Sequence, residues 1–108
     1  MQLRILIIVL LAISIPVHAA FMTGAQLKQN LDDARSNASF KGMTMGMGYV
    51  AGVYDMVDRS QVCITQELSA REAMQIVHTY LNTHRSELEQ PAAALVVKAL
   101  SEEFPCKQ

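Results

Sequence analysis

The sequence is poor in tryptophan, in aromatic side chains and in charge of either sign. It has no tryptophan, and aromatic residues make up 6% and charged residues 18% of its 108 residues. Nine Lys and Arg against ten Asp and Glu give a net charge of -1, so no basic field exists that would gather nucleic acid or an anionic membrane. Because 51% of the residues are hydrophobic, the chain is too apolar for intrinsic disorder, and one folded domain is expected.

Catalytic and metal-binding motifs are also missing. The sequence contains no G-x-S-x-G, no C-x-x-C and no glycine-rich phosphate loop after a strand. His78 and His84 are separated by about 240° around a helix, so they cannot share a metal ion as a pair one turn apart can. We therefore predict no enzymatic activity, no metal site and no cofactor.

The first nineteen residues have the features of a secretory signal peptide. Arg4 supplies one positive charge, an apolar run follows from Ile5 to Ile15, and small residues precede a cleavage point after Ala19. As a helix the run would span about 16 Å, which is too short for a bilayer core of about 30 Å. We expect residues 1–19 to be removed and residues 20–108 to form an exported domain without a membrane anchor.

The two cysteines, Cys63 and Cys106, both lie in the expected mature chain. An even number of cysteines in an exported protein favours a disulfide bond. Closing a loop of about 44 residues would stabilise the fold by roughly 4 kcal/mol on the chain-entropy model. The alternative is a reactive or metal-binding thiol, but no local motif supports it.

Hydrophobic spacing predicts helices and no strands. We expect an all-α fold, a small four-helix bundle stapled by the disulfide and preceded by the cleaved signal peptide. The first expected helix follows a capping box at Thr23, and the second runs from about Ser39 to Asp58. The third runs from a capping box at Ser69 through Leu81, and the fourth begins with Pro91 and ends before Pro105.

The second predicted helix is unusual because it is apolar on two sides and rich in glycine. Its broad face is expected to contain Phe40, Met43, Met47, Val50, Ala51, Tyr54 and Val57. Each glycine in a helix costs about 1 kcal/mol relative to alanine, which suggests close approach of another backbone or a bend. The second apolar patch, which borders the glycines, is expected to form a homodimer interface through Met45, Tyr49, Gly52 and Met56.

Met43, Met45 and Met47 follow the M-x-M-x-M spacing of soft-metal sites. In an extended segment the three thioethers could bind Cu(I) together. In a helix Met45 points away from the other two, and methionine commonly fills irregular gaps in a core. A copper-binding protein is therefore the weaker interpretation.

Five short blocks together carry a resemblance to a known family. They are Gly48–Asp55, Cys63, Tyr80–His84, Pro91–Val96 and Phe104–Cys106. In order and spacing they resemble the Rap/Tai family of immunity proteins, which are small exported helical proteins that protect against peptidoglycan-amidase effectors of type VI secretion. The resemblance implies a periplasmic protein that blocks the cleft of a cognate toxin, typically as a homodimer. Relatives often have a further cysteine just before the G-Y-V-A-G block, where Met45, Gly46 and Met47 stand here.

A segment that blocks a cleft must protrude and be rigidly supported, because ordering a flexible loop costs binding energy. The polar connection from Asn82 to Gln90 is our candidate, with Asn82, His84, Arg85 and Glu87 as the expected toxin-binding residues. Folding alone does not explain these side chains. An ordinary solvated loop is the alternative.

A small acid-stress chaperone is another alternative, since such proteins are also helical and contain a single disulfide. It would need carboxylates whose protonation opens a dimer. The chain has no charged tail that would keep client proteins soluble at low pH.

Overall fold

A computed structural model describes residues 21–36, 39–57 and 59–107. These segments form α2 (Gly24–Arg35), α3 (Phe40–Met56), α4 (Ala70–Thr83), the short 3-10 helix η1 (Arg85–Glu87) and α5 (Ala92–Glu103). The only β-type pairing within these ranges is an isolated bridge between Thr23 and Pro91. The predicted all-α, four-helix class is confirmed. The predicted signal peptide, residues 1–19, lies outside the described residues.

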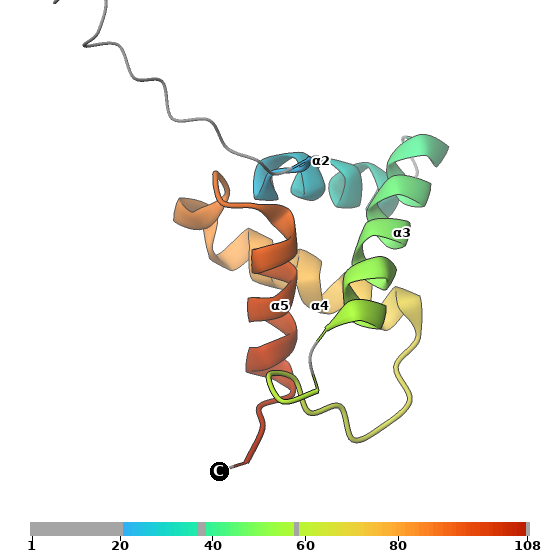
Figure 1. The fold of residues 1–108 in the computed structure, drawn as a ribbon. Helices are drawn as coiled ribbons and strands as arrows, with labels where there is room; N and C mark the ends of the chain where they lie inside the picture. Colours follow the sequence, from blue (N-terminus) through green and yellow to red (C-terminus); the bar gives the residue numbers. More distant parts are fainter. Residues whose placement is uncertain (1–20, 37–38, 58, 108) are drawn as a thin grey trace, which may run out of the picture.

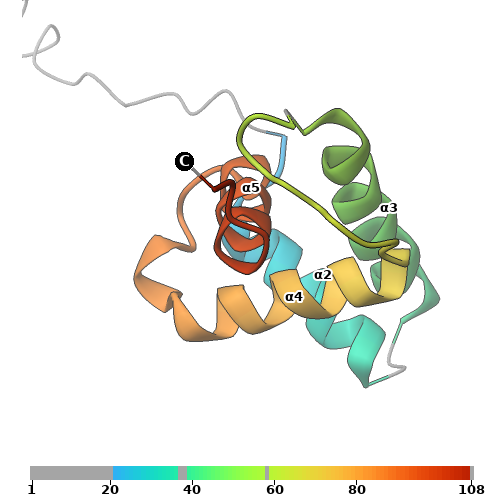
Figure 2. The ribbon, with the colours of Figure 1, turned by 90° about the horizontal axis from the view of Figure 1, so that it is seen from below.

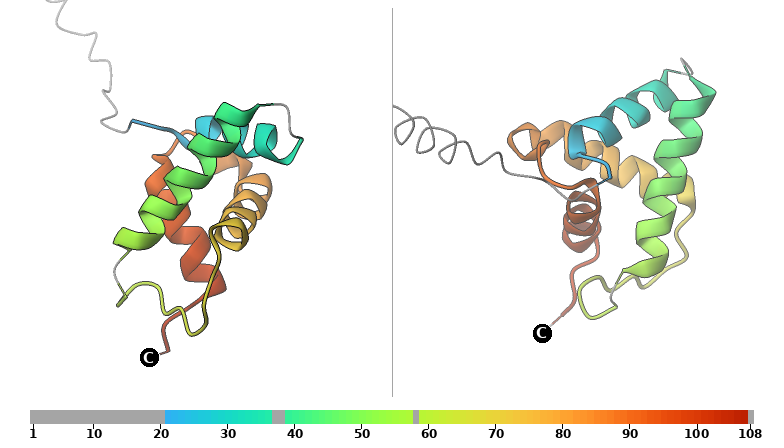
Figure 3. Two further views of the ribbon diagram at one scale, coloured as in Figure 1. Left: turned by 90° about the vertical axis from the view of Figure 1, so that its right-hand side faces the viewer. Right: turned by 45° about the horizontal axis from the view of Figure 1, so that its top comes forward.

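The helices form a bundle in which two nearly parallel helices are crossed by the other two. In Figure 1, α3 and α5 both run downwards, α2 lies across their upper ends, and α4 crosses behind them. The side views in Figure 3 show the same crossing of α2 over α3 and α5. No helix of the described segments is long and apolar enough to cross a membrane.

The core draws on all four α-helices and on the loop between α3 and α4. Its buried side chains are Leu27, Leu31, Val50, Val57, Val62, Ala73, Val77, Tyr80, Leu81, Ala92, Leu95, Val96, Ala99 and Leu100. Removing these apolar groups from water is the main force that holds such a small bundle together.

The helix starts follow from local capping chemistry. At Thr23 the backbone N–H donates to Gln26 Oε1 at 2.9 Å and the hydroxyl accepts from the Gln26 N–H, and Ser69 forms the same box with Glu72. Both capping boxes were predicted. The expectation that Pro91 is the first helical residue is wrong by one position: its ψ of 132° is extended, so Pro91 is the N-cap and α5 begins at Ala92.

The packing face of α3 agrees only in part with the expected one: Val50 and Val57 are buried as expected, but other positions differ. Phe40 is 79% exposed, and the buried row is Gly42, Gly46 and Val50. A Cβ added at Gly42 would lie 2.8 Å from Asp33 Cβ. The missing side chains of Gly42 and Gly46 therefore let α2 approach α3 closely, as the glycine content suggested.

The disulfide joins Cys63, in the loop between α3 and α4, to Cys106 after α5, with the Cα atoms 4.9 Å apart. The Cys63 N–H also donates to the Phe104 carbonyl at 3.0 Å. Next to it Val62 is fully buried. Figure 2 shows this long loop running from α3 past the C-terminal end of α5 to α4. The predicted disulfide is confirmed, and it fastens the loop to the chain's end.

Candidate partner-binding surfaces

The connection between α4 and α5 is shorter and more ordered than a simple polar loop. α4 continues to Thr83, two residues beyond the expected end at Leu81, so Asn82 is helical. The His84 Nδ1 lies 2.8 Å from the Tyr80 carbonyl oxygen, and the Thr83 hydroxyl donates to the Thr79 carbonyl at 3.0 Å. The Thr83 hydroxyl also lies 3.1 Å from the Tyr80 carbonyl oxygen, which is one of the last four of α4 and has no partner within the helix. The 3-10 turn η1 then follows directly.

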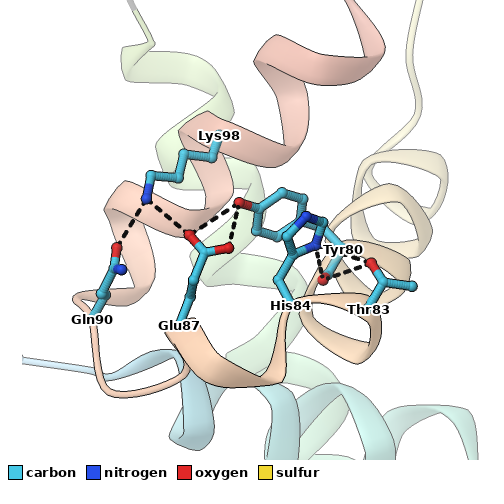
Figure 4. Close-up of polar contacts among 6 residues, drawn as sticks. All are labelled: Tyr80, Thr83, His84, Glu87, Gln90 and Lys98. Carbon is cyan, nitrogen blue, oxygen red and sulfur yellow. Dashed lines mark hydrogen bonds and ion pairs between the residues drawn. The ribbon is translucent and has the colours of Figure 1, made fainter.

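The ring of His84 stacks on the ring of Tyr80 (Figure 4), with centroids 3.8 Å apart and planes inclined by 10°. The buried Tyr80 hydroxyl donates to the Glu87 carboxylate at 3.1 Å. Burial and this nearby carboxylate raise the pKa of Tyr80 to about 12. The phenol therefore stays protonated and remains a donor over the whole physiological range.

Glu87 links η1 to α5. The ammonium of Lys98 donates to Glu87 Oε1 at 2.9 Å and to the side-chain oxygen of Gln90 at 3.0 Å (Figure 4). The hydrogen bond from Lys98 holds the pKa of Glu87 below its ordinary value, despite some desolvation, and the Tyr80 hydroxyl adds to the effect.

Backbone hydrogen bonds fasten the same connection to the start of α2. The Gly24 N–H donates to the Gln90 carbonyl at 2.9 Å and the Ala25 N–H to the Leu88 carbonyl at 2.8 Å. These are two of the first-turn donors that a helix cannot satisfy by itself. Gly24 is required here, because a Cβ would lie 3.1 Å from the Leu88 Cα and would overlap Leu95. The connection is therefore a supported turn.

A shallow groove of about 650 Å³ lies between α3 and α5. Its lining residues are Gly48, Tyr49, Gly52, Val53, Met56, Val57, Gln61, Ala93 and Val97. Three of the four expected dimer-interface residues line it, and Met56 is 84% exposed. Met45 is exposed but lies outside the lining. Ala93 and Val97 of α5 complete the groove, and nothing in their local sequence indicates a pairing with α3.

A deeper pocket of about 530 Å³ is enclosed by α2, α3 and α4. It is lined by Leu31, Ala34, Arg35, Met43, Met47, Arg71, Met74, Gln75, His78 and Thr79. Met45 is not among them, so the fold separates the M-x-M-x-M thioethers. Within the described segments no group of three or more His, Cys, Asp or Glu side chains could hold a metal ion.

A family model of Rap1a immunity proteins matches residues 23–106. The chain belongs to the Rap1a immunity protein family. The match begins at the N-cap of α2 and ends at Cys106, so it includes all of the helices described above and the disulfide. No curated protein matches the chain. The resemblance to immunity proteins is confirmed, and the family indicates a protein that protects against a secreted toxin.

For this Rap1a immunity protein, the structure separates the expected toxin-binding residues into two groups. The side chains of His84 and Glu87 make the internal contacts described above, so the idea that folding does not account for them is wrong. Asn82 is half-buried at the end of α4. Arg85 is exposed and has no hydrogen-bond or ion-pair partner among the described residues. Toxin binding by these four residues stays a prediction, for which Arg85 is now the strongest candidate.

Proposed function

We propose that this Rap1a family member is exported to the periplasm, where it binds and blocks a cognate toxin that cleaves peptidoglycan as an amidase. The family match over residues 23–106 is the observation that carries the proposal. The signal-like segment before Ala20 and the disulfide both suit an oxidising compartment outside the cytoplasm.

The connection between α4 and α5 is the surface we assign to the toxin. It is fastened to α2 by backbone hydrogen bonds and to α5 by the ion pair of Glu87 with Lys98. Binding through such a preorganised turn loses little conformational entropy. It presents Arg85, whose guanidinium is free to form paired hydrogen bonds to a carboxylate of the toxin.

The groove between α3 and α5 is the surface we assign to a second copy of the chain. It is uncharged, so it brings no like-charge repulsion across a two-fold axis. Nothing lies within 4 Å of a Cβ added at Gly48 or Gly52, so a partner helix has room to approach the backbone. Pairing would also cover the exposed Met56 side chain.

Arg85→Glu tests the assignment of the toxin surface. A periplasmic amidase effector encoded beside this gene would be co-expressed with the wild-type or variant protein, and growth and affinity would be measured. We expect the variant to lose protection and to bind at least tenfold more weakly, since one charge-assisted contact is worth about 1.5–3 kcal/mol. Its unfolding transition should not change, because Arg85 is exposed and forms no hydrogen bond or ion pair among the described residues.

Lys41→Glu is the matched control, because Lys41 is an exposed cation on α3 away from this turn. It should protect as well as the wild type. If Arg85→Glu protects equally well, the turn is not the toxin surface. If the wild-type protein does not bind the amidase at all, the proposed target is wrong.

A further inference from the structure

The pocket between α2, α3 and α4 has the volume of a small-molecule site. Its volume of about 530 Å³ falls within the range of roughly 300–1,000 Å³ that is typical of ligand pockets. Leu31 and Ala34 of α2 and three methionines form its apolar wall. Methionine side chains are flexible and polarisable, so they can adapt to the shape of an apolar guest.

The charge on the pocket wall is of one sign. Arg35 and Arg71 both line it, and no Asp or Glu does. Both arginines are exposed, and neither guanidinium has a hydrogen-bond or ion-pair partner among the described residues. The two come from different helices, α2 and α4, so it is the fold that brings them to one pocket.

Asp32 is hydrogen-bonded to a residue of the pocket lining, but its carboxylate is already paired. Asp32 accepts hydrogen bonds from the lining residue His78 at 2.6 Å and from Lys28 at 2.7 Å. It therefore does not supply the missing partner for either arginine. A pocket with two free guanidiniums favours an anion. It disfavours a metal cation, even though methionine thioethers line it.

We propose that this pocket binds an amphipathic anion, an apolar small molecule that carries one carboxylate. Arg35 and Arg71 would hold the carboxylate through charge-assisted hydrogen bonds at the rim, while the apolar part packs among Met43, Met47 and Met74. The site is separate from the turn that we assign to the toxin and does not depend on the proposed function.

Three probes with the same ten-carbon chain test the charge requirement: decanoate, decanol and decyltrimethylammonium. Each would be titrated, below its micelle-forming concentration, into the disulfide-bonded protein while amide chemical shifts are recorded. We expect decanoate to shift amides of the residues that line the pocket, and the neutral and cationic probes to bind at least about tenfold more weakly. Equal binding of all three would overturn the proposal, as would decanoate shifts confined to the α3–α5 groove.

Arg35→Gln and Arg71→Gln test the two guanidiniums. Both residues are exposed, so the variants should fold, and each should weaken decanoate binding about tenfold. Arg59→Gln is the control, since Arg59 is exposed in the loop after α3, over the Tyr54 ring, and should bind decanoate as the wild type does. Unchanged affinity in both pocket variants would overturn the proposal.

Discussion

At the scale of single residues, the chain places its buried polar groups in specific pairs. His78 is 8% exposed and bonds to Asp32 across the α2–α4 contact. Tyr80 bonds to Glu87. In the described residues no buried side-chain nitrogen or oxygen lacks a partner. Since an unpaired buried polar group costs about 1–3 kcal/mol, the pair of His78 with Asp32 favours the packing of α4 on α2, and the pair of Tyr80 with Glu87 favours the position of η1.

Asp32→Asn should make stability less dependent on pH. Burial alone would raise the pKa of Asp32, but hydrogen bonds from Lys28 and His78 outweigh it and hold the pKa below 3.8. A lowered pKa stabilises the fold above the ordinary value, and that contribution is lost as the pH falls through the folded-state value. Because the carboxylate is 38% exposed, solvent screening limits the expected loss at pH 7 to about 1 kcal/mol.

Urea unfolding at pH 7 and pH 3 measures this effect. The difference in the free energy of unfolding between wild type and Asp32→Asn should be smaller at pH 3 than at pH 7. Asp55→Asn, at an exposed carboxyl of α3, should show no such difference at either pH. If the difference in the free energy of unfolding between wild type and Asp32→Asn is as large at pH 3 as at pH 7, the ionised carboxylate has no such role.

At the scale of elements, α3 uses its glycines in two opposite ways. Gly42 and Gly46 are buried against α2, whereas Gly48 and Gly52 face open space beside α5. From the sequence alone, each of these glycines is expected to destabilise the helix by a similar amount. Only the packing of α2 tells which glycines are required for contact.

Two alanine substitutions in α3 should therefore change stability in opposite directions. At Gly42 a Cβ would lie 2.8 Å from Asp33 Cβ and 3.2 Å from the Asn30 carbonyl oxygen, so Gly42→Ala should cost about 1–3 kcal/mol. At Gly48 no atom of the same chain is near, so Gly48→Ala should stabilise the monomer by up to about 1 kcal/mol through helix propensity. Urea unfolding measures both. A stabilising Gly42→Ala would show that α2 does not approach α3 at Gly42 as described, and a destabilising Gly48→Ala would show that Gly48 does not face open space.

Gly52→Leu tests α3 as a dimerisation element. The added side chain would project into the groove and block a second copy, while α3 remains helical. Light scattering should then show a monomer where the wild type is a dimer, with an unchanged circular dichroism spectrum. Thr44→Leu, at an exposed α3 position outside the groove, is the control and should stay dimeric. A dimer that persists in Gly52→Leu would place the interface elsewhere.

At the scale of the whole molecule, local features were predictable and contacts between helices were not. The capping boxes at Thr23 and Ser69 depend on residues three positions apart, so the sequence alone reveals them. The contact between Tyr80 and His84 has the four-residue spacing of helix neighbours and could have been found in the same way. The pocket beside Arg35 and Arg71 could not, because its residues come from three helices whose crossing is decided by long-range packing.

The partly wrong prediction of the packing face of α3 has the same origin, since Val50 and Val57 are buried as expected but Phe40 is not. Hydrophobic periodicity counts large side chains, so it favoured Phe40, which lies exposed at the start of the helix. The surface that packs on α2 contains glycine, which such a pattern does not score. A sequence pattern predicts where apolar groups recur, whereas close backbone approach depends on the partner helix.

Reducing the disulfide should destabilise the whole molecule by about 2–4 kcal/mol, a large share of the roughly 5–15 kcal/mol typical of a domain. The bond closes a chain separation of 43 residues that contains α4 and α5. Beside it, one backbone hydrogen bond, from the Cys63 N–H to the Phe104 carbonyl, joins the loop to the chain's end within the described residues.

The Cys63→Ser/Cys106→Ser double variant and hydrogen exchange measure this effect. Protection should fall first in the loop after α3 and in the last turn of α5, because these lose their covalent link. Amides of the α4–α5 turn should keep more protection, since α2 and Lys98 hold that turn independently. Toxin binding measured well below the unfolding transition should then survive reduction. Loss of binding in a still-folded double variant would move the toxin surface towards the disulfide and away from Arg85.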